Sequence, residues 1–94
     1  MQVVFTVLAE RDLEEIGDYI AIDNPSRAVS FVREIREHCA EISSSPLGYT
    51  SRPDLGEGVR SCSLGRYLIL FQSSDTDVLL VRVLHGARDL PALL

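Results

Sequence analysis

The chain of 94 residues is long enough for one domain with one hydrophobic core, and we expect residues 1–94 to fold as a single domain. Hydrophobic residues make up 46% and charged residues 24%, which is typical of a soluble folded protein and not of a disordered chain. The net charge is −5 and all nine basic residues are arginine, which disfavours diffuse binding to nucleic acid because such binding depends on excess positive charge.

The first part of the chain predicts a strand followed by a helix. Residues 2–8 are mostly β-branched, aromatic or apolar, so we expect a strand that is covered on both faces or nearly so. Apolar residues then recur at helical spacing, with acidic residues on the opposite face, and this pattern predicts an amphipathic helix that ends near Asp23. The apolar positions of this helix are Ala9, Leu13, Ile16 and Ile20.

A second helix is predicted to follow directly. In "DNPS", Asn24 can cap a helix and Pro25 suits its first position, where the missing N–H costs nothing. The helix is expected to end at "SSSP", residues 43–46, because the residue before a proline avoids helical angles. Two helices with so short a join pack side by side in opposite directions. The apolar stripe of the second helix is Ala28, Phe31, Val32, Ile35, Cys39 and Ile42.

An irregular loop and three strands complete the chain. Residues 46–58 are rich in proline and glycine and predict a loop, of the length that often carries function. Strands are predicted over about 59–64, 66–72 and 78–84, with a tight hairpin at Gly65 and a looser one at 73–77.

Alternation along the strands predicts which side chains share a face of the sheet. In the middle strand Tyr67, Ile69 and Phe71 lie opposite Leu68, Leu70 and Gln72; in the last, Val78, Leu80, Arg82 and Leu84 lie opposite Leu79, Val81 and Val83. The fold class is therefore α+β in the order β-α-α-β-β-β, an antiparallel sheet with an antiparallel helical hairpin packed on one face.

The two cysteines and the histidines do not form a recognisable metal site. Cys39 and Cys62 are isolated, without a CxxC motif, and are expected as small core residues in a reducing compartment, not as a disulfide. His38 lies next to Cys39 but points elsewhere on a helix, so no metal site is expected.

The two ends of the chain carry apolar residues. The N-terminal run "VVFTVL" is too short to cross a bilayer or to act as a signal peptide, so a cytoplasmic protein is expected. The C-terminal "ALL" after Pro91 is expected either to join an interface or to cover the core.

Arginines gather after residue 50, on or beside the predicted strands. If several of them share a face, they form an anion-binding surface on a rigid support, which is a typical anchor for a protein partner. The alternative is that each arginine pairs with a nearby acid. The predicted partner-binding residues are Arg52, Arg60, Arg66, Arg82, His85 and Arg88.

His85, in "VRVLHGARDL", is the obvious candidate for acid or base chemistry because an imidazole titrates near neutral pH. The competing interpretation is a structural hydrogen bond at the end of a strand, with Asp89 close enough to serve. We favour the structural role, and no GxSxG motif supports a serine nucleophile.

The ensemble of "RDLEEIGDYIAIDNPSRAVSFVREI", "RPDLGEGVRS", "GRYLILF" and "VRVLHGARDL" resembles the ParE type of toxin in the ParE/RelE superfamily. The resemblance runs in order over nearly the whole chain. It implies a small α+β toxin of a type II toxin-antitoxin system, neutralised by a ParD-like antitoxin whose C-terminal segment wraps it. It also implies a protein that poisons DNA gyrase by binding, without a cofactor and without catalysis.

Two alternatives remain open beside this leading hypothesis. The related RelE toxins cut mRNA on the ribosome, and Arg60 and His85 could align with that chemistry, with arginine stabilising the phosphate and histidine protonating the leaving oxygen. No lysine and no clear general base accompany them. The third possibility is a non-toxic module that only binds the antitoxin.

Overall fold

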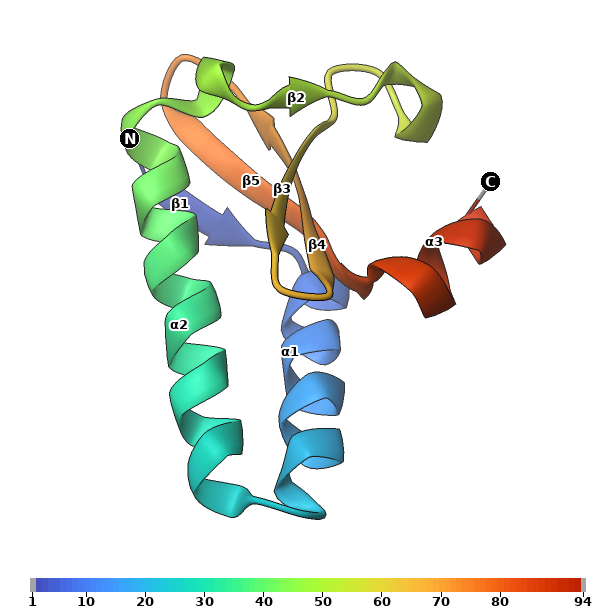
Figure 1. The fold of residues 1–94 in the computed structure, drawn as a ribbon. Helices are drawn as coiled ribbons and strands as arrows, with labels where there is room; N and C mark the ends of the chain where they lie inside the picture. The colour runs from blue at the N-terminus through green and yellow to red at the C-terminus, as the bar shows by residue number, and fades with distance from the viewer. Residues whose placement is uncertain (1, 94) are drawn as a thin grey trace.

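A five-stranded sheet with two long helices on one face forms the molecule in a computed structural model, which describes residues 2–93 and the side chains as far as Leu90 (Figure 1). The strand order is β1-β5-β4-β3-β2. The elements are β1 (Gln2–Phe5), α1 (Val7–Ala21), α2 (Pro25–Ser44), β2 (Thr50–Ser51), β3 (Arg60–Leu64), β4 (Tyr67–Ser73), β5 (Asp77–His85) and α3 (Gly86–Leu93).

The predicted α+β class, with a mainly antiparallel sheet and a helical hairpin, is confirmed. β1 is the exception within the sheet, because it pairs with β5 in parallel, with Val4 opposite Leu79. This parallel pairing follows from the chain's path: β1 lies at one edge and the whole helical hairpin connects it to the rest of the sheet.

β1 is shorter and more exposed than the predicted strand 2–8. Thr6 ends it, because its hydroxyl accepts a hydrogen bond from the N–H of Ala9 (3.0 Å) and so caps α1. The same hydroxyl donates to the carbonyl of Val81 (2.9 Å), which fixes the start of the helix against β5. The expectation of cover on both faces is wrong, since Gln2 and Val4 are exposed.

The join between the two helices follows the sequence signals. The side chain of Asn24 accepts a hydrogen bond from the N–H of Arg27 (3.1 Å), and Pro25 is the first residue of α2. This cap and the proline set the sharp reversal that brings α2 back beside α1.

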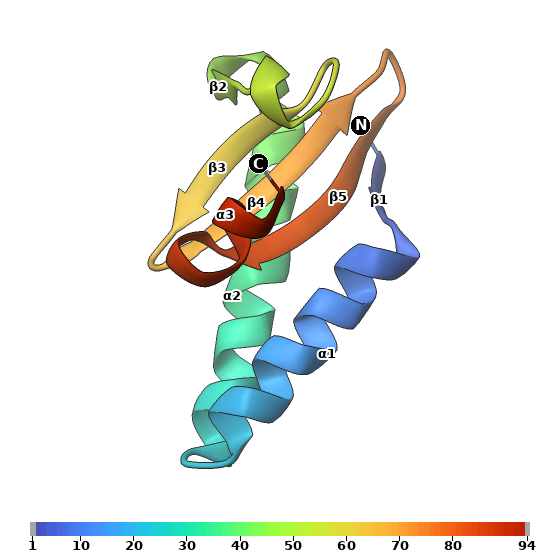
Figure 2. The ribbon, with the colours of Figure 1, turned by 90° about the vertical axis from the view of Figure 1, so that its right-hand side faces the viewer.

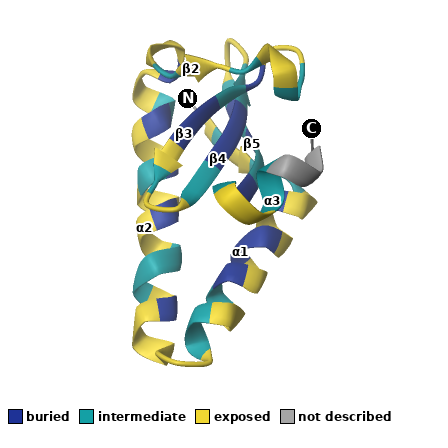
Figure 3. Ribbon diagram, turned by 45° about the vertical axis from the view of Figure 1, so that its right-hand side comes forward, coloured by how far each residue is buried: buried dark blue, intermediate teal, exposed yellow. Residues whose placement is uncertain are grey.

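The main core lies between the helical hairpin and one face of the sheet (Figure 3). Cys39 and Cys62 are both buried free thiols in this layer, as predicted. Its buried members are Ala9, Leu13, Ile16, Ile35, Cys39, Ile42, Cys62, Ile69, Phe71, Val78, Leu80 and Val83.

A β-bulge changes the alternation of side chains in β5. Leu70 pairs with Arg82 but Phe71 pairs with Leu80, so Val81 is an extra residue in β5. After the extra residue the faces exchange: Val83 lies in the main core, and Leu84 lies on the opposite face. The prediction that Val78, Leu80, Arg82 and Leu84 share one face is therefore wrong, whereas that for β4 is confirmed.

The predicted loop over residues 46–58 contains regular structure. Two short 3₁₀ turns, Pro46–Gly48 and Pro53–Leu55, flank β2, and Ser51 of β2 pairs with Arg60. The second turn lets Leu55 pack on a small cluster of Val59, Leu70 and Leu84, on the sheet face opposite the helices.

α3 was not predicted from the sequence. It follows β5 without a loop and lies on the same side of the sheet as the small cluster, with α2 behind the sheet (Figure 2). The apolar side chains of the C-terminal "ALL" lie outside the described residues. No helix among the described residues is long and apolar enough to cross a membrane.

Candidate partner-binding surfaces

Asp12 and Arg82 tie α1 to β5 beside the bulge. Asp12 is 7% exposed and accepts two hydrogen bonds from Arg82, from Nε to Oδ2 (2.8 Å) and from Nη2 to Oδ1 (3.0 Å). Its Oδ2 also accepts from the N–H of Val83 (2.9 Å), so the carboxylate satisfies a backbone group of β5 just after the bulge. The hydrogen bonds to Asp12 raise the pKa of Arg82 above its ordinary value. The position of Arg82 is thus set by the fold.

His85 and Asp89 hold the start of α3. The N–H of Arg88 donates to Nδ1 of His85 (3.2 Å), so the imidazole acts as a helix cap and its neutral form carries the proton on Nε2. Asp89 accepts from the backbone N–H of His85 (2.9 Å), not from its ring, which differs from the expected contact. The ring of Tyr67 lies edge-on to the imidazole, 5.5 Å between centroids. These contacts agree with the structural interpretation of His85.

Arg88 is an accessible arginine at this end of the sheet. Its side chain is 61% exposed and pairs with the neighbouring Asp89, from Nε to Oδ1, at 2.9 Å. The guanidinium and the N–H of His85 lower the pKa of the Asp89 carboxyl. Because such an exposed pair contributes little to stability, Arg88 can exchange Asp89 for a carboxylate of a partner.

A hollow of about 370 Å³ lies between α1, β5 and α3, and both ion pairs line it. Arg66 is close to this end, because its carbonyl accepts from the N–H of Gly86 (3.0 Å). The hollow is polar and open to solvent, which suits the charged side chains of a protein partner. Its lining is Asp12, Glu15, Ile16, Tyr19, Tyr67, Arg82, Val83, Arg88 and Asp89.

Arg52 and Arg60 lie where β3 begins, at the opposite end of the sheet from α3. Arg60 donates from Nη1 to the carbonyl of Tyr49 (2.7 Å) and so holds the segment before β2. Arg52 binds Asp54 through two hydrogen bonds of 3.0 and 2.8 Å, and this contact lowers the pKa of the Asp54 carboxyl. The structure therefore divides the predicted arginines between two ends of the sheet and does not bring them into one surface.

The pair considered for nuclease chemistry is also divided. Arg60 lies opposite Phe71 and His85 lies opposite Tyr67, in strands on either side of β4. Phe71 and Tyr67 are four residues apart, which is about 13 Å along a strand. The structure therefore does not bring Arg60 and His85 together.

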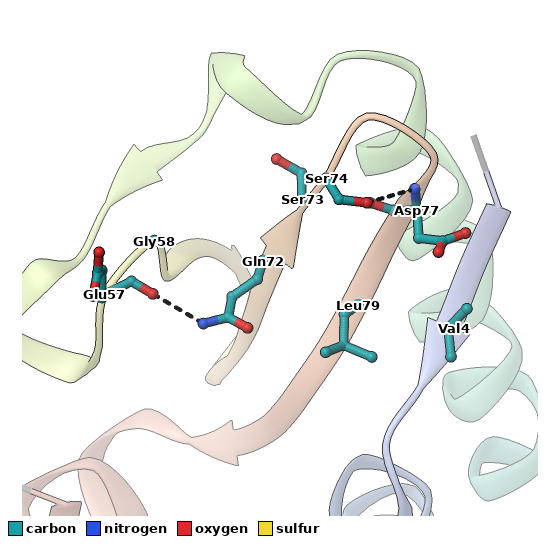
Figure 4. Close-up of a pocket in the computed structure, with 8 residues that line it drawn as sticks. All are labelled: Val4, Glu57, Gly58, Gln72, Ser73, Ser74, Asp77 and Leu79. Carbon is teal, nitrogen blue, oxygen red and sulfur yellow. Dashed lines mark hydrogen bonds between the residues drawn. The ribbon is translucent and has the colours of Figure 1, made fainter.

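A second hollow, of about 770 Å³, lies on the sheet face away from the helices (Figure 4). Its apolar part comes from Val4 and Leu79, which are paired between β1 and β5. Gln72 borders it and donates to the carbonyl of Glu57 (2.9 Å). Its other lining residues are Gly58, Ser73, Ser74 and Asp77.

The hollow in Figure 4 was missed at the level of sequence, although Val4 and Leu79 are signals for it. Apolar residues at alternate positions on two neighbouring strands give an apolar sheet face, and here no helix covers it. An apolar floor with hydroxyl, amide and carboxylate groups at its edge suits a peptide segment of a protein partner.

Neither hollow contains a recognisable metal or nucleophile site. Among the described residues, no group of three histidine, cysteine, aspartate or glutamate side chains could hold a metal ion. Burial raises the pKa of the Cys39 thiol to about 12, so this thiol is a poor nucleophile near neutral pH.

The five-stranded sheet with a helical hairpin on one face defines a small α+β fold with two open hollows. Residues 3–90 match the family described as the ParE toxin of type II toxin-antitoxin systems, parDE, and the chain belongs to this family. The resemblance predicted from the sequence is confirmed.

Two solved structures have a similar fold. A chain of the chromosomal ParDE toxin-antitoxin system from P. aeruginosa has a TM-score of 0.77 and 23% identity, over 88% of this chain and 92% of that one. A chain of the toxin-antitoxin complex RelBE2 from Mycobacterium tuberculosis has a TM-score of 0.66 and 29% identity, over 89% and 95%. No curated protein sequence matches the chain. The chain is thus a ParE/RelE-type toxin of a toxin-antitoxin system.

Proposed function

We propose that the toxin inhibits DNA gyrase, and with it replication, by binding and not by its own catalysis, and that a ParD-like antitoxin neutralises it. The observation that carries this proposal is the use of the candidate catalytic side chains to hold the fold. His85 caps α3, and Arg60 binds the carbonyl of Tyr49. Arg82, predicted only as a partner-binding residue, is likewise held by the fold, through buried Asp12. Membership of the ParE family supports the same proposal.

The antitoxin is proposed to cover two neighbouring surfaces. The open sheet face with Val4 and Leu79 offers an apolar site for a segment of its chain. The α3 end offers the guanidinium groups of Arg66 and Arg88 to its acidic side chains, with the imidazole of His85 beside them. Arg52, Arg60 and Arg82 complete the proposed contact set, although the latter two also support the fold through their own hydrogen bonds.

The test of the gyrase proposal is expression of the toxin in bacterial cells without its antitoxin. We expect filamentous cells with damaged DNA, and purified toxin should inhibit supercoiling by purified gyrase until antitoxin is added. Cells of normal shape with arrested translation and cleaved mRNA would falsify the proposal. Normal growth would favour a non-toxic module that binds only the antitoxin.

A RelE-like mRNA endoribonuclease is the second candidate, favoured by the 29% identity to a chain of the RelBE2 complex. It requires Arg60 and His85 to act on one phosphate on the ribosome. Primer extension on cellular mRNA after toxin expression decides between the two. Cleavage that disappears in His85→Ala would establish the nuclease, and uncut mRNA excludes it.

A further inference from the structure

The outer side of the helical hairpin carries an apolar groove, which shares Leu13 with the main core. It lies between α1 and α2, with a volume of about 550 Å³. Val29 is 62% exposed there, although it belongs to a long helix whose other apolar stripe is buried against the sheet. The apolar lining comprises Leu13, Gly17, Ala21, Pro25, Ala28, Val29 and Val32.

Gly17 lies where the two helices meet at the groove. A Cβ at Gly17 would lie 3.4 Å from Cγ2 of Val32, which is van der Waals contact, so a side chain larger than alanine would occupy the floor of the groove. The small residues Gly17, Ala21 and Ala28 therefore leave a continuous channel between the helices. A third helix fits such a channel, as an amphipathic helix does in a helix-lined groove.

The acidic side chains of the hairpin indicate which kind of helix would bind in the groove. Glu10, Glu14 and Asp18 follow one another at intervals of four residues along α1, so they form a row along one edge of the groove. Arg36 pairs with Glu10 (2.9 Å), while the described residues give no ion pair to Glu14 or Asp18. Like charges at this spacing repel, and a cation from a partner relieves that repulsion.

The net charge of the two helices excludes a second copy as the occupant. Residues 7–44 contain nine acidic residues and four arginines, so the hairpin carries a net charge of −5. Two such hairpins repel each other. A helix with an apolar stripe flanked by lysine or arginine is instead complementary to the apolar floor and the acidic edge of the groove.

We propose that this groove binds a basic amphipathic helix of the toxin's target protein, so that the helical hairpin is the surface that meets the target. The inference rests on the proposed function, in which the antitoxin covers the sheet face and the α3 end. The groove lies on the other side of the hairpin from the sheet core, and the proposed antitoxin surfaces leave it accessible.

The recognition chemistry is tested first with a designed probe, independently of gyrase. The probe is an 18-residue helical peptide with a leucine stripe flanked by lysine, and its control has glutamate in place of lysine. We expect the lysine peptide to bind the toxin and to shift the NMR signals of Ala28, Val29 and Val32, with affinity that falls as salt rises. No binding, or equal binding of the glutamate peptide, overturns the proposal.

A pair of charge-reversal variants locates the binding. Glu14→Lys with Asp18→Lys changes the groove, and the matched control, Glu37→Lys with Glu41→Lys, makes the same change at the same spacing on α2, outside the groove. All four acids are exposed, so both variants should fold. We expect at least tenfold weaker peptide binding in the groove variant alone. Equal loss in both variants contradicts a specific groove.

The same variants are then tested with the purified target. If the toxin inhibits gyrase, the groove variant should lose inhibition while its affinity for the antitoxin stays unchanged and the control variant behaves as the wild type. Inhibition by the groove variant at the wild-type level, or a selective loss of antitoxin binding, overturns the assignment of the groove. If even the wild-type toxin leaves gyrase active, the proposed function fails, and the peptide experiment alone decides whether the groove recognises a basic helix.

Discussion

The pair of Arg82 with Asp12 and the pair of Arg88 with Asp89 have similar hydrogen-bond geometry and different surroundings. Each arginine reaches its carboxylate through two nitrogens, at 2.8 to 3.3 Å. The first pair joins α1 to β5 across 70 residues of sequence and is largely buried; the second joins neighbouring residues at the surface. The difference separates an arginine that sets the fold from one that is available to a partner.

Removing the buried carboxylate should have the largest effect. Asp12→Ala leaves Arg82 and the N–H of Val83 without their acceptor, so we expect the free energy of unfolding to fall by about 3 kcal/mol. Urea denaturation followed by circular dichroism measures this, with Asp18→Ala, an exposed acid on the same helix, as the control. Equal effects of the two substitutions would show that the buried pair does not stabilise the fold.

The two arginines should differ in the same measurement. Arg82→Ala leaves Asp12 buried with only the N–H of Val83, and we expect a loss of about 2 kcal/mol. Arg88→Ala removes an exposed pair and should cost about 0.5 kcal/mol or less. A double-mutant cycle of Arg82→Ala with Asp12→Ala should give a coupling energy of about 1 kcal/mol or more. Additive effects contradict the role assigned to the buried pair.

Arg88, whose removal should have little effect on stability, should have a clear effect on antitoxin binding. Arg88→Ala is expected to weaken the complex with the antitoxin about tenfold, which corresponds to about 1.4 kcal/mol. Calorimetric titration measures it, and Arg33→Ala, an exposed arginine on α2, serves as the control. Equal affinities of Arg88→Ala and wild type would remove Arg88 from the contact set.

The smallest expected effect is a loss of stability of α3 at acid pH, when Asp89 is protonated. The folded-state pKa of Asp89 is lower than its ordinary value, because Arg88 and the N–H of His85 stabilise the carboxylate. Its contribution to stability is therefore present above the unfolded-state pKa of about 3.9 and is lost as pH falls through the folded-state value. The protection of the α3 amides from hydrogen exchange, relative to their intrinsic exchange rates, should fall over this acid range in the wild type. Asp89→Asn should reduce that dependence on pH. An unchanged profile contradicts the role of Asp89 in holding α3.

Local signals in the sequence were sufficient for the helical hairpin and the strand pairs. Asn24 and Pro25 set the start of α2 through local contacts, and Gly65 has a φ of +59°, which suits a tight hairpin. Thr6 is a local signal of the same kind, but it was included in an expected strand because its neighbours favour extended structure. Its hydroxyl contact with Val81 depends on β5 being in place.

The partner-binding surfaces could be predicted only in part. Five arginines and His85 are predicted from the sequence as candidates, but the sequence contains no measure of which arginine has a buried partner 70 residues away. The bulge at Val81 could not be predicted from the sequence either, because period-two alternation assumes an unbroken strand. The open hollow beside Val4 and Leu79 was missed because apolar strand residues were assumed to be covered.

By itself, the sequence determined the α+β class and the helical hairpin, because periodicity, caps and turns act over a few residues. It also predicted the core cysteines, and its motifs carried the resemblance to the ParE family. Only the tertiary structure decided that Asp12 holds Arg82, that β1 runs parallel to β5, and that Arg60 and His85 lie apart. These features depend on the register between distant strands and helices. That register is fixed by packing in the folded core and not by any short segment of the chain.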